Sequence, residues 1–317
     1  MRRMRIIFIV GLIFLPFFCS AQEHNILMFW NIENYFDPFD DPNTKDDDFT
    51  SQGLKRWYWS RFLQKRNYIA KLIFQVEDKY GALPDIIGLA EVENRFVLNK
   101  LIYETALARC DYSIIHKDSK DRRGIDVALL YRKFSFNVLQ SKFIEVPLPK
   151  GKTTRDILYV RGVLMNSAGA AREDTLNIFV LHFPSKFGGA KVSEPFRKAA
   201  ASTLYSQLDF LKGQKFICMG DFNDSPNSEI FHQIPSAAKL MFSKEYAKGT
   251  IKYRGVWETI DNFITSQNLK VKAEIFQSPL LLENDETYLG LKPFRTYIGP
   301  KYNGGISDHL PIIAIIK

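Results

Sequence analysis

Polar residues that can hold a metal ion or move a proton follow several apolar runs of this sequence. In KFICMGDFNDSPNSE (215–229), the apolar residues 216–219 lead directly into Asp221 and Asn223. Turn chemistry accounts for such a stretch, because Asn, Asp, Gly, Ser and Pro all favour turns. Catalysis at the carboxyl end of a strand accounts for it equally well, and this stretch alone does not separate the two interpretations.

The same pattern recurs in six other stretches along the chain. They end on or contain Asn31 and Glu33 (25–34), Glu91 (84–94), Asp126 (124–132), His182 (175–186), Asp261 (258–265), and Asp308 with His309 (304–316). A single strand-end Asn or Asp is more often a turn former, and a single His among apolar neighbours is usually structural. Buried carboxylates, however, are costly unless they are paired or bound to a metal. Convergence of several strand ends on one metal-binding cleft explains the whole set together.

The elements that position these residues indicate an α/β chain. Apolar residues at helical spacing predict helices over 60–77 and 194–212. Elsewhere strands follow one another closely, at 112–145 and 156–182, which favours sheets packed face to face with helices outside over a regular βαβ alternation. No internal repeat or Gly/Ser-rich linker divides the chain, so we expect one domain over 22–317.

The amino terminus, residues 1–21, has the features of an export signal. Three arginines precede an apolar run from Ile6 to Phe18, and Cys19-Ser20-Ala21 fits a small-residue cleavage site before Gln22. An uncleaved anchor is the first alternative, but the run is short for a span of about 20 residues. Lipidation of Cys19 is the second. We expect an exported protein, periplasmic or extracellular, with no stable membrane anchor.

Charge and cysteine content bound the function only loosely. The formal net charge is +8, and three of the basic residues lie in the leader. The remaining modest basic excess is compatible with a phosphorylated or polyanionic substrate without establishing one. Beyond the leader the chain keeps only Cys110 and Cys218, which is no disulfide framework, so we expect two free core thiols.

Taken together and in this order, the motifs resemble those of the endonuclease/exonuclease/phosphatase superfamily, the fold of pancreatic-type deoxyribonuclease. The resemblance covers essentially the whole chain after the leader. It rests on WNIEN, GLAEVEN, VLHFPS, GDFN, ETIDNF and SDHLP, and within the superfamily the stretch FRTYIGPKYNGGISDHLP is most similar to a secreted bacterial branch. The resemblance implies a four-layered α/β sandwich, with two mixed β-sheets packed face to face and helices on the outer faces.

The resemblance also implies a Mg²⁺ site, for which Mn²⁺ or Ca²⁺ are alternatives. Glu91 is the expected principal ligand, Asn31 lies beside the metal and the phosphate, and Asp308 is the carboxylate on the far side. Glu33 stands where some apurinic endonucleases carry an acidic ligand. Such a set suits Mg²⁺, which takes oxygen donors and few protein ligands.

For the chemical step, the resemblance assigns His309 as the general base that activates water. Asp261 holds its other ring nitrogen and stabilises the imidazolium. Asp221 and Asn223 orient the nucleophile and the phosphoryl oxygens. No covalent intermediate is needed.

Three further residues are assigned supporting roles around the phosphate. His182 donates to a phosphoryl oxygen or assists the leaving group, and Asp126 is a candidate partner for it. Lys186, in SKFGGAK (185–191), is a candidate phosphate contact.

The expected function is a secreted, metal-dependent nuclease that hydrolyses phosphodiester bonds of DNA or RNA as a monomer. The same centre also suits a phosphatase or phospholipase C-like enzyme acting on lipid head groups, inositol phosphates or sugar phosphates. A non-catalytic binding module on this fold is the third alternative. It is disfavoured because Glu91, Asp221, Asp308 and His309 are all present.

Overall fold

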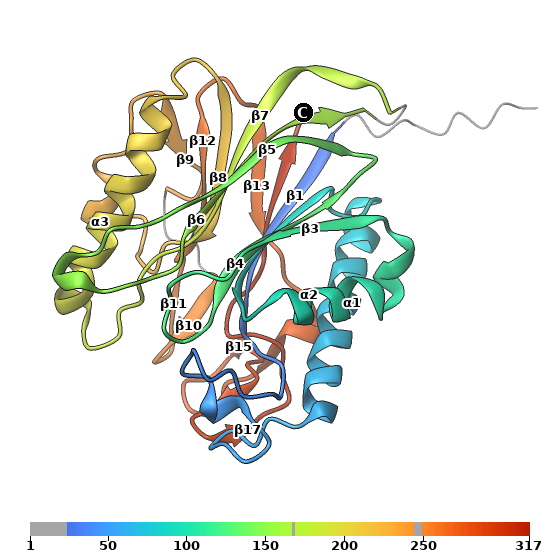
Figure 1. The fold of residues 1–317 in the computed structure, drawn as a ribbon, viewed down its shortest axis with the longest axis vertical. Coiled ribbons are helices and arrows are strands. Elements are labelled where there is room, and N and C mark those ends of the chain that lie inside the picture. The colour runs from blue at the N-terminus through green and yellow to red at the C-terminus, as the bar shows by residue number, and fades with distance from the viewer. Residues whose placement is uncertain (1–23, 167–168, 244–248) are drawn as a thin grey trace, which may run out of the picture.

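The computed structural model describes residues 24–166, 169–243 and 249–317, whose arrangement is shown in Figure 1. The expected leader (1–21) and the cleavage site before Gln22 lie outside these residues. Three α-helices are described: α1 (Trp59–Tyr80), α2 (Arg95–Tyr103) and α3 (Ala190–Asp209). No helix in the described part of the chain is long and apolar enough to cross a membrane.

The first large sheet has six strands and is mixed. Only β1 and β2 pair in parallel, and the other neighbours are antiparallel. In sheet order the strands are β13 (Val271–Ile275), β18 (Ile312–Ile316), β1 (Asn25–Tyr35), β2 (Ile86–Val92), β4 (Asp126–Arg132) and β3 (Tyr112–His116).

The second large sheet also has six strands and one parallel pair, β7 with β8. In sheet order the strands are β5 (Phe136–Ile144), β6 (Ile157–Met165), β7 (Ala171–His182), β8 (Lys215–Asp221), β12 (Asp261–Ser266) and β9 (Ala238–Leu240).

Short elements complete the described chain. Three two-stranded ribbons pair β10 (Ile251–Tyr253) with β11 (Val256–Glu258), β14 (Leu282–Asn284) with β15 (Leu291–Pro293), and β16 (Tyr297–Ile298) with β17 (Lys301–Tyr302). Single 3₁₀ turns occur at Asp47–Phe49, Ala106–Arg109, Pro149–Gly151, Glu229–Phe231 and Pro279–Leu281. In Figure 1 the labelled members of these ribbons gather at the lower end of the molecule.

Three hydrophobic clusters separate four layers. One lies between α1, α2 and the first sheet and contains Phe62 and Trp30; one lies between the two sheets and contains Phe29 and Met219. The third lies between the second sheet and α3. In Figure 1 the sheets accordingly lie between α3 on the left and α1 and α2 on the right. The expected fold, two mixed sheets with helices on the outer faces, is confirmed.

The two predicted helices form where their apolar spacing placed them. α1 buries Phe62, Ile69, Ile73 and Val76 on one face, and it ends at Gly81, whose left-handed φ of 78° allows its N–H to bond the Glu77 carbonyl. Its observed bounds extend the predicted 60–77 by a few residues. α3 starts four residues before the predicted 194–212 and ends three residues earlier. Both cysteines beyond the leader are free, and Cys218 is buried in the core.

Candidate active site

The site residues continue the rows of core side chains that lie between the two sheets. Successive strand residues point to opposite faces, so in β8 Ile217 and Met219 enter the inter-sheet core and Asp221 follows on the same face. In β7 Val180 enters this core and His182 follows it. The polar side chains therefore lie at the end of the inter-sheet core, directly after its last apolar residues.

His309 and Asp261 form the closest side-chain pair of the site. His309 Nδ1 lies 2.8 Å from Asp261 Oδ2, and His309 Nε2 lies 3.9 Å from both Asp221 Oδ2 and Asp308 Oδ1. Burial alone would lower the pKa of His309, but the charges of Asp261 and Asp221 outweigh it and raise the pKa well above its usual 6.5. This arrangement is that of a His–Asp acid–base pair.

Backbone contacts fix the position of His309. Trp30 Nε1 donates to the His309 carbonyl at 2.9 Å, and the His309 N–H donates to Ser307 Oγ at 3.0 Å. Ser307 Oγ in turn donates to the Asn31 carbonyl at 2.6 Å. The loop before β18 is therefore tied to β1, and the imidazole has a defined orientation.

Asn31 joins two carboxylates of the site. Its Nδ2 donates to Asp221 Oδ2 at 3.1 Å and to Glu91 Oε1 at 3.3 Å, and its Oδ1 accepts the Glu33 N–H at 3.0 Å. Glu91 Oε2 accepts the Asn34 N–H at 2.8 Å. Asn31 therefore orients Glu91 and Asp221 through its amide, with its oxygen directed to backbone, and its coordination of a metal stays a prediction.

Several residues at the site have a left-handed backbone. Glu33, Asn34, Glu91 and Asn223 have φ values of 47°, 49°, 61° and 51°. This region is unfavourable for residues with a Cβ, and such strain concentrates at functional sites. Three of these residues lie where β1 and β2 lose their regular register, so the bend that aims Glu91 is part of the site's construction.

His182 lies on the side of Asp221 that is opposite the His309–Asp261 pair. Its Nε2 is 3.6 Å from Asp221 Oδ2 and 3.9 Å from Glu91 Oε1, while its buried Nδ1 has no hydrogen-bond partner among the described residues. Burial, reinforced by the charges of Arg155 and Arg123, holds the pKa of His182 well below 6.5. His182 is therefore a neutral imidazole beside a site whose other histidine favours the charged form.

Asp126 is not the partner of His182, which corrects the prediction. Its carboxylate accepts the Ser119 N–H at 3.1 and 3.2 Å. The cause is strand alternation: Val127 and Leu129 face the inter-sheet core, so Asp126 has the same parity as Ala128, which faces the helices. Burial raises the pKa of Asp126 to about 7.

Asp221 and Asn223 share one tight turn. The Asn223 N–H donates to Asp221 Oδ1 at 2.8 Å, and Asn223 Nδ2 donates to the Phe183 carbonyl at 3.0 Å. Burial, together with the charge of Asp261, raises the pKa of Asp221 to about 7. The GDFN residues therefore form a turn and also place a carboxylate in the site, and their part in catalysis stays a prediction.

A second group of charges lies beside Asp308. Arg295 Nη2 donates to Asp308 Oδ2 at 2.9 Å, and Arg295 Nε lies 3.6 Å from Glu33 Oε1. Glu33 Oε2 accepts the Thr296 N–H at 2.7 Å. Burial and the Asp308 charge raise the pKa of Glu33 to about 7. The carboxylate oxygens of Glu33 face Arg295 and Thr296, so Glu33 stabilises the position of this arginine. Metal coordination by Glu33 stays a prediction.

The sequence did not predict the role of Lys65, which contacts this group of residues from α1. It is buried in α1, its Nζ donates to Thr296 Oγ1 at 2.7 Å and to the Glu33 carbonyl, and burial lowers its pKa to about 8. A signal was present, since Lys65 falls three residues after Phe62 on the apolar face of a predicted helix. A cation at a core-facing position indicates a buried polar partner.

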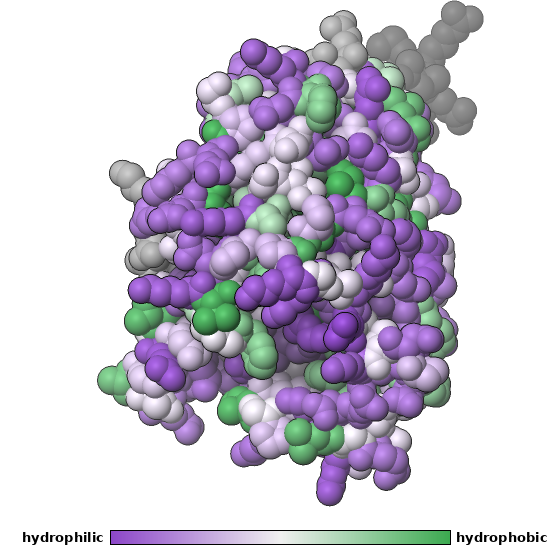
Figure 2. Space-filling model, turned by 60° about the vertical axis from the view of Figure 1, so that its left-hand side comes forward, coloured by the Kyte–Doolittle hydropathy of each residue, from purple (hydrophilic) through white to green (hydrophobic). Residues whose placement is uncertain are grey.

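The site opens into a groove of about 890 Å³. Asn223, Arg295 and Asp308 line it at the site, and Lys186 lines it further out, where Nζ lies 3.2 Å from Glu258 Oε2. The lining also includes Phe187, Tyr253, Lys252, Lys292 and Ile298. The space-filling view has a hollow in its lower half, the end at which the ribbons gather, bordered by hydrophilic side chains (Figure 2).

The donors at the site fit a hard divalent cation. Glu91 and Asp308 retain some exposure, and among the described residues no Lys or Arg lies within ion-pair distance of the Glu91 carboxylate. An unpaired, mostly buried carboxylate favours a bound cation. Asp221, Asp261 and His309 also offer atoms within 4.8 Å of one another, but there the Asp261 oxygen is engaged by His309.

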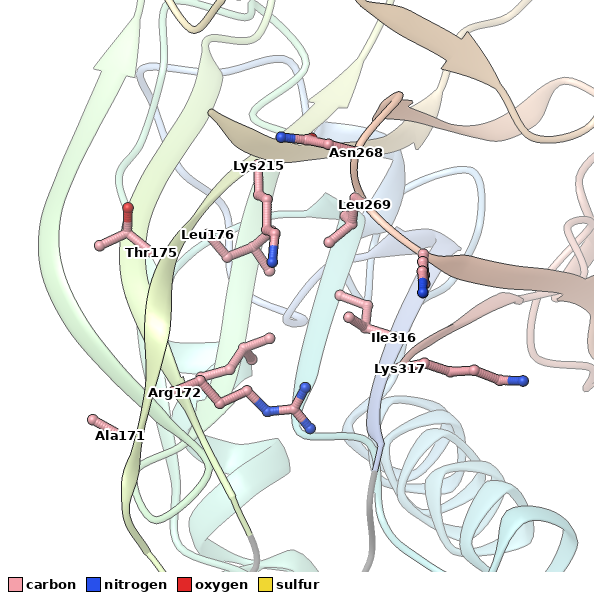
Figure 3. A pocket seen from close by; sticks show the side chains of 11 residues that line it. Ala171, Arg172, Thr175, Leu176, Lys215, Asn268, Leu269, Ile316 and Lys317 are labelled. Atoms are coloured by element: carbon pink, nitrogen blue, oxygen red, sulfur yellow. The ribbon is translucent and has the colours of Figure 1, made fainter. Parts of the chain in front are cut away.

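A second pocket, of about 510 Å³, is separate from this site. It lies where β8 begins and β18 ends, lined by Lys215, Leu269 and Ile316 among others (Figure 3). Asp221 ends β8, so the pocket is at the opposite end of that strand from the histidines.

Comparisons with known proteins agree with this arrangement. Truncated TDP2 of Caenorhabditis elegans is 19% identical with a TM-score of 0.58, over 93% of this chain and 97% of that one. The human nocturnin catalytic domain with bound sulfate is 18% identical with a TM-score of 0.58, over 93% of each chain. A mannosyl-6-phosphatase of Bacteroides thetaiotaomicron is 16% identical with a TM-score of 0.59, over 92% of this chain and 99% of that one.

These identities show a shared fold and leave the substrate open. No curated protein sequence matches the chain. The sequence model of the Endonuclease/Exonuclease/phosphatase family, in contrast, matches residues 26–317, nearly the whole described chain. The chain therefore belongs to the endonuclease/exonuclease/phosphatase family and is a hydrolase of phosphate esters.

Proposed function

We propose that this protein is an exported, Mg²⁺-dependent phosphodiesterase that cleaves nucleic acid with a water activated by His309. One observation carries the proposal: the His309–Asp261 pair, Asp221 and His182 gather next to Asn223 and Asp308, which line a groove much larger than one phosphate group. A phosphomonoesterase needs room on one side of phosphorus, whereas a phosphodiesterase must hold chain on both sides.

The described side chains divide the reaction among them. His309 Nε2 accepts the proton of the attacking water, and Asp261 stabilises the imidazolium that results. Neutral His182 donates from Nε2 to a phosphoryl oxygen, and Asp221, held by Asn31 Nδ2, orients the water between the two histidines. Glu91 and Asp308 would hold the Mg²⁺, which neutralises charge on the phosphate when bound.

The walls of the groove supply contacts for the rest of the substrate. Phe187 is 92% exposed, and Tyr253 is also exposed on β10, so two aromatic rings are available to stack on nucleobases. Arg295 is the arginine nearest the metal ligands, and contact with a phosphate would compete with its bond to Asp308. These features favour a short single-stranded segment.

A second candidate, hydrolysis of a small phosphate ester such as a sugar phosphate or lipid head group, also has support. The lysines of the groove are already paired: Lys186 with Glu258, Lys252 with Asp285 at 2.7 Å, and Lys292 with Glu283 at 3.7 Å. A long polyanion needs unpaired cations along its path. Balanced charge of this kind suits a substrate with one phosphate.

Incubation of the mature protein with Mg²⁺ against five substrates separates these functions. They are plasmid DNA, RNA, sphingomyelin, bis-p-nitrophenyl phosphate and p-nitrophenyl phosphate. The proposal predicts cleavage of nucleic acid and the diester ahead of the monoester, abolished by chelator and by Glu91→Gln. Preference for the monoester or for sphingomyelin selects the second candidate, and full activity in excess chelator removes the metal from the mechanism.

Export and assembly belong to the same proposal. The leader predicts a mature protein beginning at Gln22, as in a secreted bacterial branch of the family, and we expect this protein to act as a monomer. Intact mass spectrometry of the protein from its native host tests this directly. A mass that includes Met1, or a lipid on Cys19, contradicts it.

A further inference from the structure

Three potential metal ligands meet on the helix-facing side of the first sheet, away from the active site. His116 ends β3 and pairs with Ala128 of β4, and Asp126 lies two residues before Ala128 on the same face. Asp118 follows in the loop of residues 117–125. The sheet register therefore fixes two of the three side chains, and the loop supplies the third.

The ligand atoms of this cluster face one another. One ring nitrogen of His116 and one carboxylate oxygen each of Asp118 and Asp126 lie within 4.8 Å of each other. The His116 side chain is only 2% exposed, its Nδ1 is 3.8 Å from Asp118 Oδ1, and its Nε2 has no hydrogen-bond partner among the described residues. Among the described residues no hydrogen bond joins the His116 ring to either carboxylate, so a buried imidazole faces two carboxylates without a direct bond to either.

The burial of Asp126 is a second reason to expect a bound cation at this cluster. It is buried, and among the described residues no Lys or Arg nitrogen comes within ion-pair distance of its carboxylate. The two nearby lysines of the loop are engaged elsewhere, Lys117 with Asp156 at 3.5 Å and Lys120 with Glu145 at 2.7 Å. A buried carboxylate without a positive partner is costly, and a metal ion removes that cost.

We propose that His116, Asp118 and Asp126 bind a divalent transition-metal ion, such as Zn²⁺, distinct from the catalytic ion. The donor set decides the class, because imidazole nitrogen combined with carboxylate oxygen suits Zn²⁺ and its neighbours better than Mg²⁺ or Ca²⁺. The metal closes the loop of residues 117–125 onto the sheet.

The loop gives this structural metal a connection to the active site. Asp121 Oδ2 accepts from Arg155 Nη1 at 3.0 Å, and Arg155 Nη2 donates to the carbonyl of Phe183 at 2.7 Å, next to His182. The same carbonyl accepts from Asn223. A metal that holds the loop therefore supports the strand end that carries His182.

Zn²⁺ binding to chelator-treated protein, measured by calorimetry in excess Mg²⁺, tests the proposal. Asp118 is 79% exposed, so Asp118→Asn should fold normally, and Asp78→Asn is a matched exposed control on α1. We expect one Zn²⁺ per chain in wild type and Asp78→Asn, and at least tenfold weaker binding in Asp118→Asn and Asp126→Asn. Zn²⁺ should also raise the melting temperature of the first two proteins and not of the other two.

Equal Zn²⁺ binding by Asp118→Asn and wild type would overturn the proposal, as would wild-type protein that binds no Zn²⁺ under these conditions. Glu91→Gln separates the two ion sites. It should keep the Zn²⁺ equivalent while losing hydrolysis, so failure of the proposed phosphodiesterase activity leaves this measurement intact. Loss of the Zn²⁺ equivalent in Glu91→Gln would assign that ion to the catalytic centre and contradict a second site.

Discussion

His309 and Asp261 form a 2.8 Å contact between the two sheets of the sandwich. Asp261 begins β12 in the second sheet, and His309 lies three residues before the start of β18 in the first. The acid–base pair therefore exists only when the sheets are in register with each other. The distance between these two side chains therefore depends on how the sheets pack as much as on the loops around the site.

Asp261→Asn should reduce kcat by roughly 10²–10⁴-fold, the range for a positioned acid or base. The charge of Asp261 raises the pKa of His309, so the variant's His309 should lose its proton at lower pH. The acid limb of its pH–rate profile should accordingly move down from a wild-type position above 6.5. Profiles between pH 5 and 9 measure both effects, and an unmoved acid limb would show that His309 is not the titrating base.

His182→Ala and His309→Ala should each cost roughly 10²–10⁴-fold in turnover, because both imidazoles flank Asp221. Since they act on one transition state, the double variant should lose far less than the product of the single losses. Turnover is to be measured per folded molecule at saturating Mg²⁺. Near-normal turnover of folded His182→Ala would reduce that residue to a structural role.

Glu93→Gln should stabilise the protein increasingly as pH rises. Burial, followed by the charge of Asp37, raises the pKa of Glu93 from 4.5 to about 9. Between these values the folded protein binds the extra proton, so wild-type stability falls with rising pH, and the variant lacks that fall. The gain should reach the order of 1–3 kcal/mol at pH 8. Urea unfolding at pH 5 and pH 8 checks it, and an equal difference at both pH values would refute the assignment.

Gly220→Ala should destabilise the fold by about 1–3 kcal/mol. A Cβ there would lie 2.3 Å from Leu181 Cδ1 and 2.5 Å from the Leu181 carbonyl oxygen, which cannot move away. Gly88→Ala is the matched control, because its Cβ would meet the flexible Met219 side chain at 3.1 Å and should cost less. Urea unfolding of both variants gives the comparison, and an equal or larger loss in Gly88→Ala would contradict it.

The sequence predicted the layers and the proximity of the main candidate site residues for identifiable reasons. Helical spacing located α1 and α3. His182 and Asp221 end the parallel neighbours β7 and β8, and His309 meets them because it lies just before β18, whose start is at the same end of the sandwich. The prediction that Asp126 is the partner of His182 was wrong because β4 is apolar on both faces. The sequence of β4 therefore does not show on which face of the sheet the carboxylate lies.

Other contacts depend on chain segments far apart in the sequence. Arg295 meets Glu33 across 262 positions, and Lys65 reaches Thr296 across 231. No local pattern encodes either pairing, because the loops that bring these side chains together have no periodicity. The contact between Glu33 and Arg295 is therefore visible only in the folded structure.

The alternation that carries core side chains into the site also constrains how such an enzyme can evolve. Adding or removing one residue between Ile217 and Asp221 would turn the carboxylate into the layer occupied by α3 and abolish activity in one step. The segments around Phe187, Tyr253 and Ile298 carry no such restriction, since they border the groove without entering either sheet core. New substrate preferences are therefore expected to arise by changes in these segments, while the spacing within β7, β8 and β12 is inherited unchanged.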